Sequence, residues 1–329
     1  MMRIVFLAFL VAGHVTLSRA DGEESQVARS SPLRPFAVSA AQGDVEAVSL
    51  LGKALVRPQF SDEVLAQREQ ELAAARGQSE ADSNDADALI WVGRRLAYLG
   101  RYREAIDVFT TGVNRFPKDA RFLRHRGHRW ITLREFGRAL ADLDAAARLT
   151  RGKRDQVEPD GLPNARNIPV GSLKSNICYH LGLAWYLKGD FERALPVYQR
   201  CAIEASNPDR LVSVSHWLYM TLRRLGRPKD ADHVLEAISS GLDVIENVAY
   251  HKLLLMYRGE IAPEELLAER MDGNDRPTIL YGIGNWYLYN GEPERARELF
   301  RRIVTDANWP AFGFIAAEAE LAREGGNAP

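Results

Sequence analysis

An internal repeat of 34 residues is the feature that most constrains how this chain folds. Gly93 precedes Gly127 by 34 residues, and Ala105 precedes Ala139 by the same interval. A period of this length is typical of a unit of two helices, and stacked units of this kind form an all-helical solenoid. A glycine stands 12 residues before an alanine in four places, and a tyrosine replaces it in a fifth: Gly93/Ala105, Gly127/Ala139, Gly182/Ala194, Gly284/Ala296 and Tyr219/Ala231.

The positions around each alanine specify both helices of such a unit. Three residues before it stands an aromatic side chain in three copies, and four residues after it stands a large apolar one, as in Phe109 and Tyr198. We expect small residues at the helix crossings and larger side chains in the grooves around them. A residue with positive φ is expected to end the first helix of a unit, and glycines stand there: Gly100, Gly189, Gly226, Gly259 and Gly291.

The segment from Leu181 to Ala194 shows the repeat in its fullest form, as Leu-Gly-x-x-Trp-x-x-x-Gly-x-Phe-x-x-Ala. This pattern closely resembles the tetratricopeptide repeat. The resemblance covers roughly two thirds of the chain after residue 20 and implies a right-handed superhelical solenoid of about six hairpins, with a capping helix at each end. It also implies a protein that holds peptides or folded partners on the concave surface formed by the first helix of each repeat.

The repeat frame predicts how the chain is divided. Repeats one and two fall at 86–153, and repeats three to six, of which the fifth is shortened, fall at 175–310. Ser61 is placed to cap a helix, so 36–85 is expected to form an N-terminal helical cap. The apolar stretch within 311–329 predicts a helix that covers the last repeat, followed by a tail.

An insertion separates repeats two and three. Gly127 and Gly182 are 55 residues apart, 21 more than one period. The inserted residues predict a loop at 154–174, because its prolines and glycines forbid helix and favour defined turns. A tolerated surface excursion is one interpretation and a functional loop is the other.

The N-terminal residues resemble a signal peptide. Arg3 precedes an apolar run at 4–13, and Ser18 and Ala20 are small residues suited to cleavage after Ala20. A run of this length is too short to cross about 30 Å of hydrocarbon. We therefore expect removal of 1–20, a flexible leader at 21–35, no stable membrane anchor afterwards, and a secreted or periplasmic protein.

Two cysteines, Cys178 and Cys201, fall near the start of one helix and the end of the other in repeat three. An antiparallel hairpin brings them close, so a disulfide is an open alternative. Helix axes 8–10 Å apart seldom satisfy disulfide geometry, however, and the favoured expectation is a pair of free buried thiols.

The chain contains no short motif for phosphate binding, nucleophilic catalysis, zinc or calcium. Its formal net charge of −1 provides no overall field for nucleic acid, and its tryptophans are spread singly through the repeats. We therefore predict no catalysis, no cofactor and no nucleic-acid partner. The alternative is a metal-dependent or otherwise unrecognised enzyme built on the histidines of repeats two to five, which are His125, His128, His180, His216 and His251.

An arginine run surrounds the first two of these histidines, at Arg121, Arg124, Arg126 and Arg129. Such a field repels a divalent cation and argues against a metal site. One interpretation of the run is a solvated helix face paired with Glu135, Asp142 and Asp144. The other is an anion-binding patch for a carboxylate, a phosphate or an acidic peptide.

Helical spacing assigns one set of side chains to the concave surface of successive first helices. Cationic and aromatic residues alternate in it, which suits an acidic or aromatic-containing peptide, and the insertion is expected to close one end of the groove. The set is Arg94, Arg124, His128, Tyr179, His216, Arg223 and Tyr281.

A protein-binding scaffold is the leading hypothesis, with the enzyme and a structural spacer between envelope components as alternatives. The best-known ligand mode of the resembling family clamps a C-terminal carboxylate with a lysine and an asparagine one turn apart. Ile90 and Arg94 stand at those positions, so that particular mode is not expected.

Overall fold

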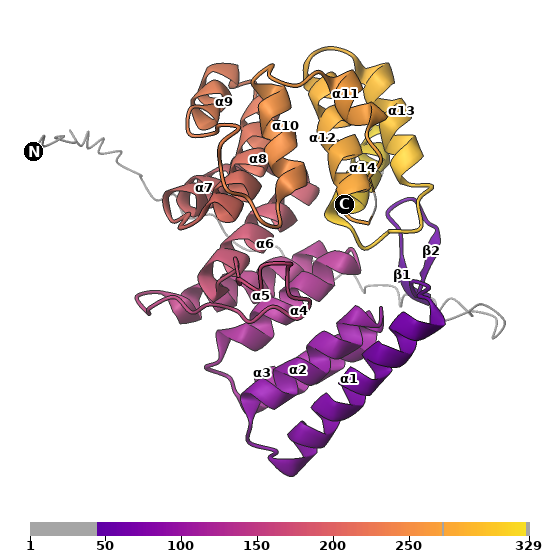
Figure 1. Ribbon diagram of the computed structural model, residues 1–329, viewed down its shortest axis with the longest axis vertical. Coiled ribbons are helices and arrows are strands. Elements are labelled where there is room, and N and C mark those ends of the chain that lie inside the picture. The colour runs from indigo at the N-terminus through magenta and orange to yellow at the C-terminus, as the bar shows by residue number, and fades with distance from the viewer. Residues whose placement is uncertain (1–44, 272, 327–329) are drawn as a thin grey trace, which may run out of the picture. The chain divides into compact units, whose positions relative to one another are not determined.

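The computed structural model describes residues 45–271 and 273–326. The expected signal peptide and leader, at 1–35, lie outside the described residues. Within them, helices follow one another in the order that the repeat frame predicts, and the chain is an all-helical repeat solenoid apart from one short hairpin (Figure 1). No helix in this described part is long and apolar enough to cross a lipid bilayer.

Six consecutive helix pairs correspond to the six expected repeats. The fifth is reduced, because its second helix is short and packs beside the first helix of the next pair. The pairs are α2 (Ala86–Tyr98) with α3 (Tyr102–Arg115), α4 (Ala120–Thr132) with α5 (Phe136–Thr150), α6 (Leu173–Leu187) with α7 (Phe191–Ile203), α8 (Pro208–Arg224) with α9 (Pro228–Leu235), α10 (Val248–Tyr257) with α11 (Pro263–Ala268), and α12 (Asp275–Tyr289) with α13 (Pro293–Ile303).

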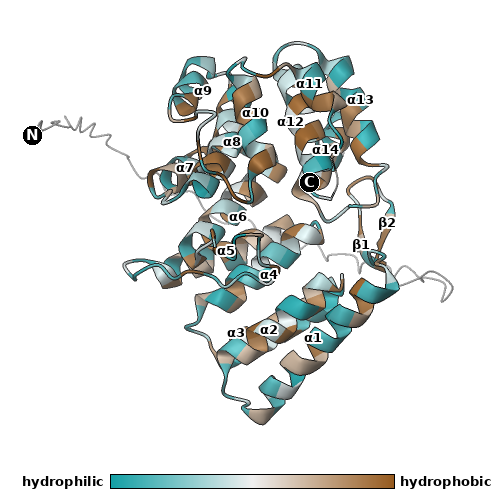
Figure 2. Cartoon of the chain, in the orientation of Figure 1, coloured by the Kyte–Doolittle hydropathy of each residue, from teal (hydrophilic) through white to brown (hydrophobic). Residues whose placement is uncertain are grey.

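Large side chains of the partner helix pack directly against the glycines of the repeat frame. A Cβ built on Gly182 would lie 2.7 Å from the Tyr198 ring, and one on Gly284 would lie 2.7 Å from the Phe300 ring. The seated residue is the one four positions after the repeat alanine. Hydrophobic and hydrophilic residues alternate along the helices of the pairs (Figure 2).

The turns between paired helices confirm the expected positive φ angles. All five helix-ending glycines adopt them, with φ between 68° at Gly226 and 87° at Gly291. In repeat two the same position is held by Arg134, at φ 66°. A non-glycine residue pays a steric penalty there, so the Arg134 side chain has to be held by contacts of its own.

The prediction of an N-terminal helical cap at 36–85 is partly wrong, because this segment also contains two β-strands. Helix α1 (Asp62–Ala81) begins at Ser61, whose Oγ accepts a hydrogen bond from the Val64 N–H. Before it, β1 (Val45–Val48) and β2 (Ala54–Val56) form an antiparallel hairpin. Trp309 Nε1 donates to the Val56 carbonyl at 2.7 Å, so residues more than 250 positions away help to hold this hairpin.

The expectation of free thiols is also wrong. Cys178 and Cys201 form a disulfide that joins α6 to α7, with their Cα atoms 5.9 Å apart. Typical axis spacing suggested a gap too wide for a bond. Gly182 lets the two helices of repeat three approach closely beside the cysteines, which brings the Cα atoms within the range that a disulfide spans.

Candidate functional site

A cavity of 690 Å³ opens on the face made by the first helices of the repeats. We call it the inner cavity. Each of the six first helices contributes to its lining, for example His128 on α4, Tyr179 on α6 and Tyr250 on α10. Other segments complete the wall, among them the insertion, the start of α1 with the residues just before it, Tyr102 at the start of α3, the residues just before α10, and residues 308–312.

Two of the seven residues predicted for the concave surface line the inner cavity, His128 and Tyr179. The other five do not. Arg94 and Arg124 contact the insertion, whereas His216, Arg223 and Tyr281 make contacts within the later repeats.

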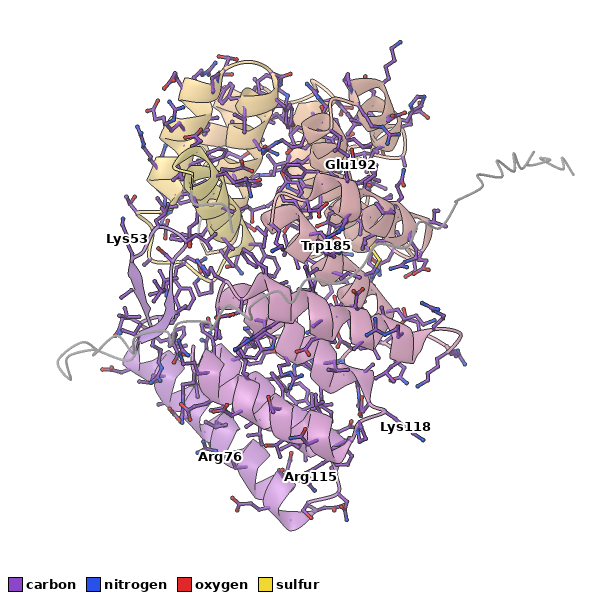
Figure 3. All side chains as sticks on the ribbon, turned by 180° about the vertical axis from the view of Figure 1, so that it is seen from behind. Lys53, Arg76, Arg115, Lys118, Trp185 and Glu192 are labelled. Carbon is purple, nitrogen blue, oxygen red and sulfur yellow. A yellow bond between two sulfur atoms is a disulfide. The ribbon has the colours of Figure 1, made fainter. Side chains whose placement is uncertain are left out.

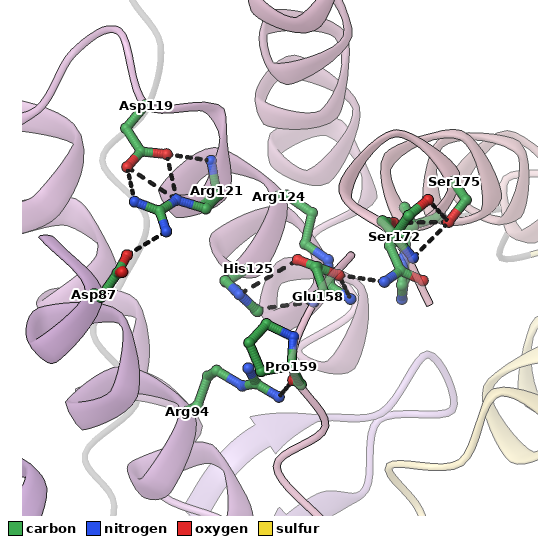
Figure 4. A network of polar contacts seen from close by, with 12 residues as sticks. Asp87, Arg94, Asp119, Arg121, Arg124, His125, Glu158, Pro159, Ser172 and Ser175 are labelled. Atoms are coloured by element: carbon green, nitrogen blue, oxygen red, sulfur yellow. Dashed lines mark hydrogen bonds and ion pairs between the residues drawn. The ribbon is translucent and has the colours of Figure 1, made fainter. Parts of the chain in front are cut away.

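The insertion occupies the two arginines that the sequence assigned to a partner (Figure 4). Arg124 forms an ion pair with Glu158 at 2.8 Å, and Arg94 donates to the Pro159 carbonyl at 2.8 Å. Burial lowers the pKa of Arg124, and Glu158 opposes that effect. These cations therefore bind the chain itself and position the insertion as a wall of the cavity.

Further contacts hold the insertion along its length. Arg95 Nη1 donates to the Gly161 carbonyl at 3.2 Å, and a side chain on Gly161 would collide with Tyr98. At its far end Arg166 pairs with Asp243 at 2.7 Å. The segment thus runs across several first helices from repeat one to the end of repeat four.

The arginine run fits both interpretations in part: some of its members pair with carboxylates, whereas Arg129 is placed to bind an anion. Arg121 pairs with Asp119 at 2.6 Å and also with Asp87 (Figure 4). Arg126 binds Asp142 through two bonds of 2.7 Å. Asp142 is a predicted partner, whereas Glu135 pairs with Arg138 instead. Arg129 has no carboxylate partner among the described residues and lines the inner cavity.

His216 and Tyr281 are buried at 1% exposure each, so they do not face an open surface. His216 stacks on Tyr250 with ring centroids 4.7 Å apart, and burial lowers its pKa to about 3. Tyr281 donates to the Tyr186 hydroxyl at 2.9 Å. Helical spacing gave the correct helices for these residues, but neighbouring helices cover them.

The final helix, α14 (Phe312–Glu324), contributes to the cover over Tyr281, whose hydroxyl lies 3.3 Å from Glu320. It packs against α12 and α13, as a cap should, and also reaches α6. Its Glu318 pairs with Arg134 at 2.6 Å, and its Glu320 pairs with Arg224 at 2.6 Å. The C-terminal helix therefore covers part of the first-helix surface, beside α12 (Figure 1) and against α6.

Neutral aromatic groups form the centre of the inner cavity. The His128 and His180 rings lie 4.3 Å apart, and Phe312 lies 5.3 Å from His128. Burial, with the nearby Arg124 and Arg129, lowers the pKa of both histidines well below the usual value. The Asn176 carbonyl lies 2.6 Å from His180 Nδ1, so that nitrogen donates and Nε2 can accept.

These rings suit packing and hydrogen bonding. No group of three or more histidine, cysteine, aspartate or glutamate side chains in the described residues lies close enough together to hold a metal ion.

Comparison with known proteins agrees with the helix pairs. Tetratricopeptide repeat family models match residues 93–154 and 279–307, which lie in repeats one and two and in repeat six. This chain contains tetratricopeptide repeats. Repeats of this family build surfaces for protein binding, and the fold supports that general role.

Solved structures similar to this tetratricopeptide repeat protein include YrrB, described as a TPR protein with an unusual peptide-binding site. The two are 16% identical with a TM-score of 0.42, and the match covers 78% of this chain and 98% of YrrB. Another is a tetratricopeptide repeat protein from Parabacteroides merdae ATCC 43184, at 16% identity and a TM-score of 0.46, with 79% and 90% covered. No curated protein matches the sequence significantly.

Sequence reasoning missed two features of the site in this tetratricopeptide repeat protein. One is Arg129, which was grouped with its helix neighbours although it alone among the four arginines lacks a carboxylate partner in the described structure. The other is the inward-facing acidic pair on α14. Glu318 and Glu320 interrupt an apolar stretch, and that interruption was the available signal of buried partners.

Proposed function

We propose that this protein is a non-catalytic scaffold that binds a short segment of a partner protein in the inner cavity. The observation that carries the proposal is a single cavity lined by the first helices of all six repeats. Its 690 Å³ is in the usual range of ligand sites, and its walls combine aromatic surface with a few polar groups.

An acidic group on the bound segment fits the lining. Arg68, Arg129 and Arg210 all reach the cavity, and none of them has an ion pair with a carboxylate in the described part of the chain. Tyr179 and Phe312 offer apolar surface beside them. Of the residues first assigned to a groove, His128 and Tyr179 are those that we expect to touch the partner.

Site-specific crosslinking tests this assignment. A photoreactive amino acid at Ser213, which lines the cavity on α8, is expected to crosslink to one defined segment of a partner. The same group at exposed Ser240 serves as the control. The identified segment should then lose affinity for Ser213→Trp, which fills the cavity, and keep it for Ser240→Trp. Crosslinks at 240 alone would place the interface on the outer surface.

We also propose that the protein is exported. The pattern at residues 1–20 supports this, and so does the disulfide, because such bonds persist mainly in oxidising compartments. Mass spectrometry of the native protein should find a mature chain that starts at Asp21. A cytoplasmic protein that retains Met1 would overturn the proposal.

A further inference from the structure

Arg129 differs from every other arginine on its helix. Arg121, Arg124 and Arg126 of α4 each form an ion pair with a carboxylate, at 2.6, 2.8 and 2.7 Å. The guanidinium of Arg129 instead lies over the Tyr102 ring, 5.4 Å from its centroid, and borders the inner cavity. It has no carboxylate partner in the part of the chain that the structure describes.

The charges around Arg129 do not compensate for this. Burial lowers its pKa to about 10, and the charged side chains that act on it are the cations Arg124 and Arg94. Arg124 is already paired with Glu158. A cation that loses water contacts without gaining a counterion is costly, and removal of such a charge usually stabilises a protein. An unpaired guanidinium on the wall of an open cavity therefore indicates a binding role.

The rim of the cavity restricts the kind of anion that can enter. Asp160, Glu246 and Asp275 line it, and burial raises the pKa of each. A ligand with several negative charges is repelled by these carboxylates. A single carboxylate on an otherwise neutral or zwitterionic ligand is repelled less, and its two oxygens match the donor fork of a guanidinium.

We infer that Arg129 receives a single carboxylate of the bound segment at the inner wall of the cavity. This inference rests on the proposed function and deepens it, because it names the chemical group that is recognised. The carboxylate belongs either to the end of a peptide chain or to an aspartate or glutamate side chain. The aromatic wall formed by Tyr102, Tyr179 and Phe312 accommodates the apolar atoms beside it.

Random octapeptide libraries test the inference. One carries free C-termini, one carries amidated C-termini, and a third is amidated and lacks aspartate and glutamate. Peptides selected on the wild-type protein are then measured by calorimetry on Arg129→Gln and on Arg76→Gln. Arg76 is an exposed arginine on α1, so its variant has the same charge change away from the cavity (Figure 3).

The expected result is selection from the libraries that contain a carboxylate and little from the third. Enrichment of the amidated library containing acidic residues would identify a side chain as the source, and enrichment of free C-termini alone would identify the chain end. Arg129→Gln should weaken binding roughly 10- to 100-fold, which corresponds to one lost charged hydrogen-bond pair. Arg76→Gln should bind as the wild type does.

Peptides that bind Arg129→Gln as tightly as wild type, yet are excluded by Ser213→Trp, would overturn the inference and leave the proposed function standing. Thermal melts in sodium acetate against sodium chloride, at equal ionic strength, give a readout that needs no peptide. Acetate should raise the melting temperature of wild type and Arg76→Gln but not of Arg129→Gln. An equal response of all three proteins would refute the carboxylate site.

The variant Arg129→Met distinguishes a loss of binding from a folding defect in Arg129→Gln. Methionine keeps the packing on Tyr102 and removes the unpaired charge. This variant should melt at a higher temperature than wild type without ligand, and it should not respond to acetate. A lower melting temperature would mean that Arg129 serves the fold, and it would overturn the binding role.

Discussion

Two parts of the first-helix surface carry buried charge in opposite ways. Where α14 packs against α12 and α6 the surface is filled, and its Glu318 and Glu320 pair with Arg134 of repeat two and Arg224 of repeat four. Elsewhere the inner cavity remains open, and at its α4 wall Arg129 has no carboxylate partner in the described residues. The same repeat frame builds both parts, so the frame supplies the surface while the covering segments decide what is left to bind a partner.

The pKa shifts express this difference. Burial alone would raise the pKa of Glu320, but Arg224 and Arg323 outweigh it and the pKa is lowered. Burial lowers the pKa of Arg129, and no carboxylate opposes it. Charge in the filled part is therefore satisfied within the chain, whereas charge in the open part is available to a ligand.

The largest effect is expected from Arg134→Gly in the filled part. Glycine adopts a φ of 66° without steric strain, so the substitution does not strain the backbone. Glu318, at 0% exposure, loses the cation that pairs with it. An uncompensated buried charge costs about 3–5 kcal/mol of unfolding free energy. Denaturant unfolding measures it, with Arg138→Ala, an exposed pair with Glu135, as a control expected to cost less than about 1 kcal/mol. Equal stability of Arg134→Gly and wild type would show that α14 does not depend on this pair.

A smaller loss is expected from Gly182→Leu, at the crossing of α6 and α7 in repeat three. The new side chain collides with the Tyr198 ring, and overpacking of this kind costs about 1–3 kcal/mol. Gly137→Leu is the matched control, because nothing lies within 4 Å of a Cβ built there. Thermal melts should separate the two variants. Identical melting temperatures would show that the helix crossing is not tight at Gly182.

Acid should destabilise the protein through its buried histidines. His128 and His180 beside the cavity, and His216, which stacks on Tyr250 of α10, have a pKa below the unfolded value near 6.5, and that of His216 is about 3. Between the folded and unfolded pKa values the unfolded chain binds more protons. Stability is therefore full above about pH 6.5 and falls as the pH drops, by about 1.4 kcal/mol per pH unit for each histidine.

Melting temperatures at pH 7.5, 6.5 and 5.5 measure this trend. Most carboxylates stay charged over this range, because their usual pKa is about 4. The decline should be steeper between the two lower values than between the two higher ones. A constant melting temperature would mean that these rings accept protons in the folded protein.

The smallest effect is expected in the lining of the open part. Ser213→Ala removes a hydroxyl that bonds to the Arg210 carbonyl at 3.1 Å within its own helix. Stability should change by less than about 0.5 kcal/mol, since no packed neighbour is lost. Denaturant unfolding checks this value. A loss as large as that of Gly182→Leu would show that the cavity lining supports the fold.

The sequence by itself determined the repeat. Its glycines mark the turns because only a residue that tolerates positive φ ends the helix there, and the 12-residue spacing marks where small residues accept large ones. Local rules of this kind act within one hairpin, so the frame, the helix that begins at Ser61 and the final helix could all be read from the chain.

Only the tertiary structure decided what the repeats present to a partner. Arg124 is covered by Glu158 of the insertion, and Arg134 is paired with Glu318, 184 residues away. The disulfide and the β-hairpin likewise depend on how closely particular elements approach. Such long-range pairings follow from the three-dimensional path of the whole chain, and helical spacing within one repeat contains no information about them.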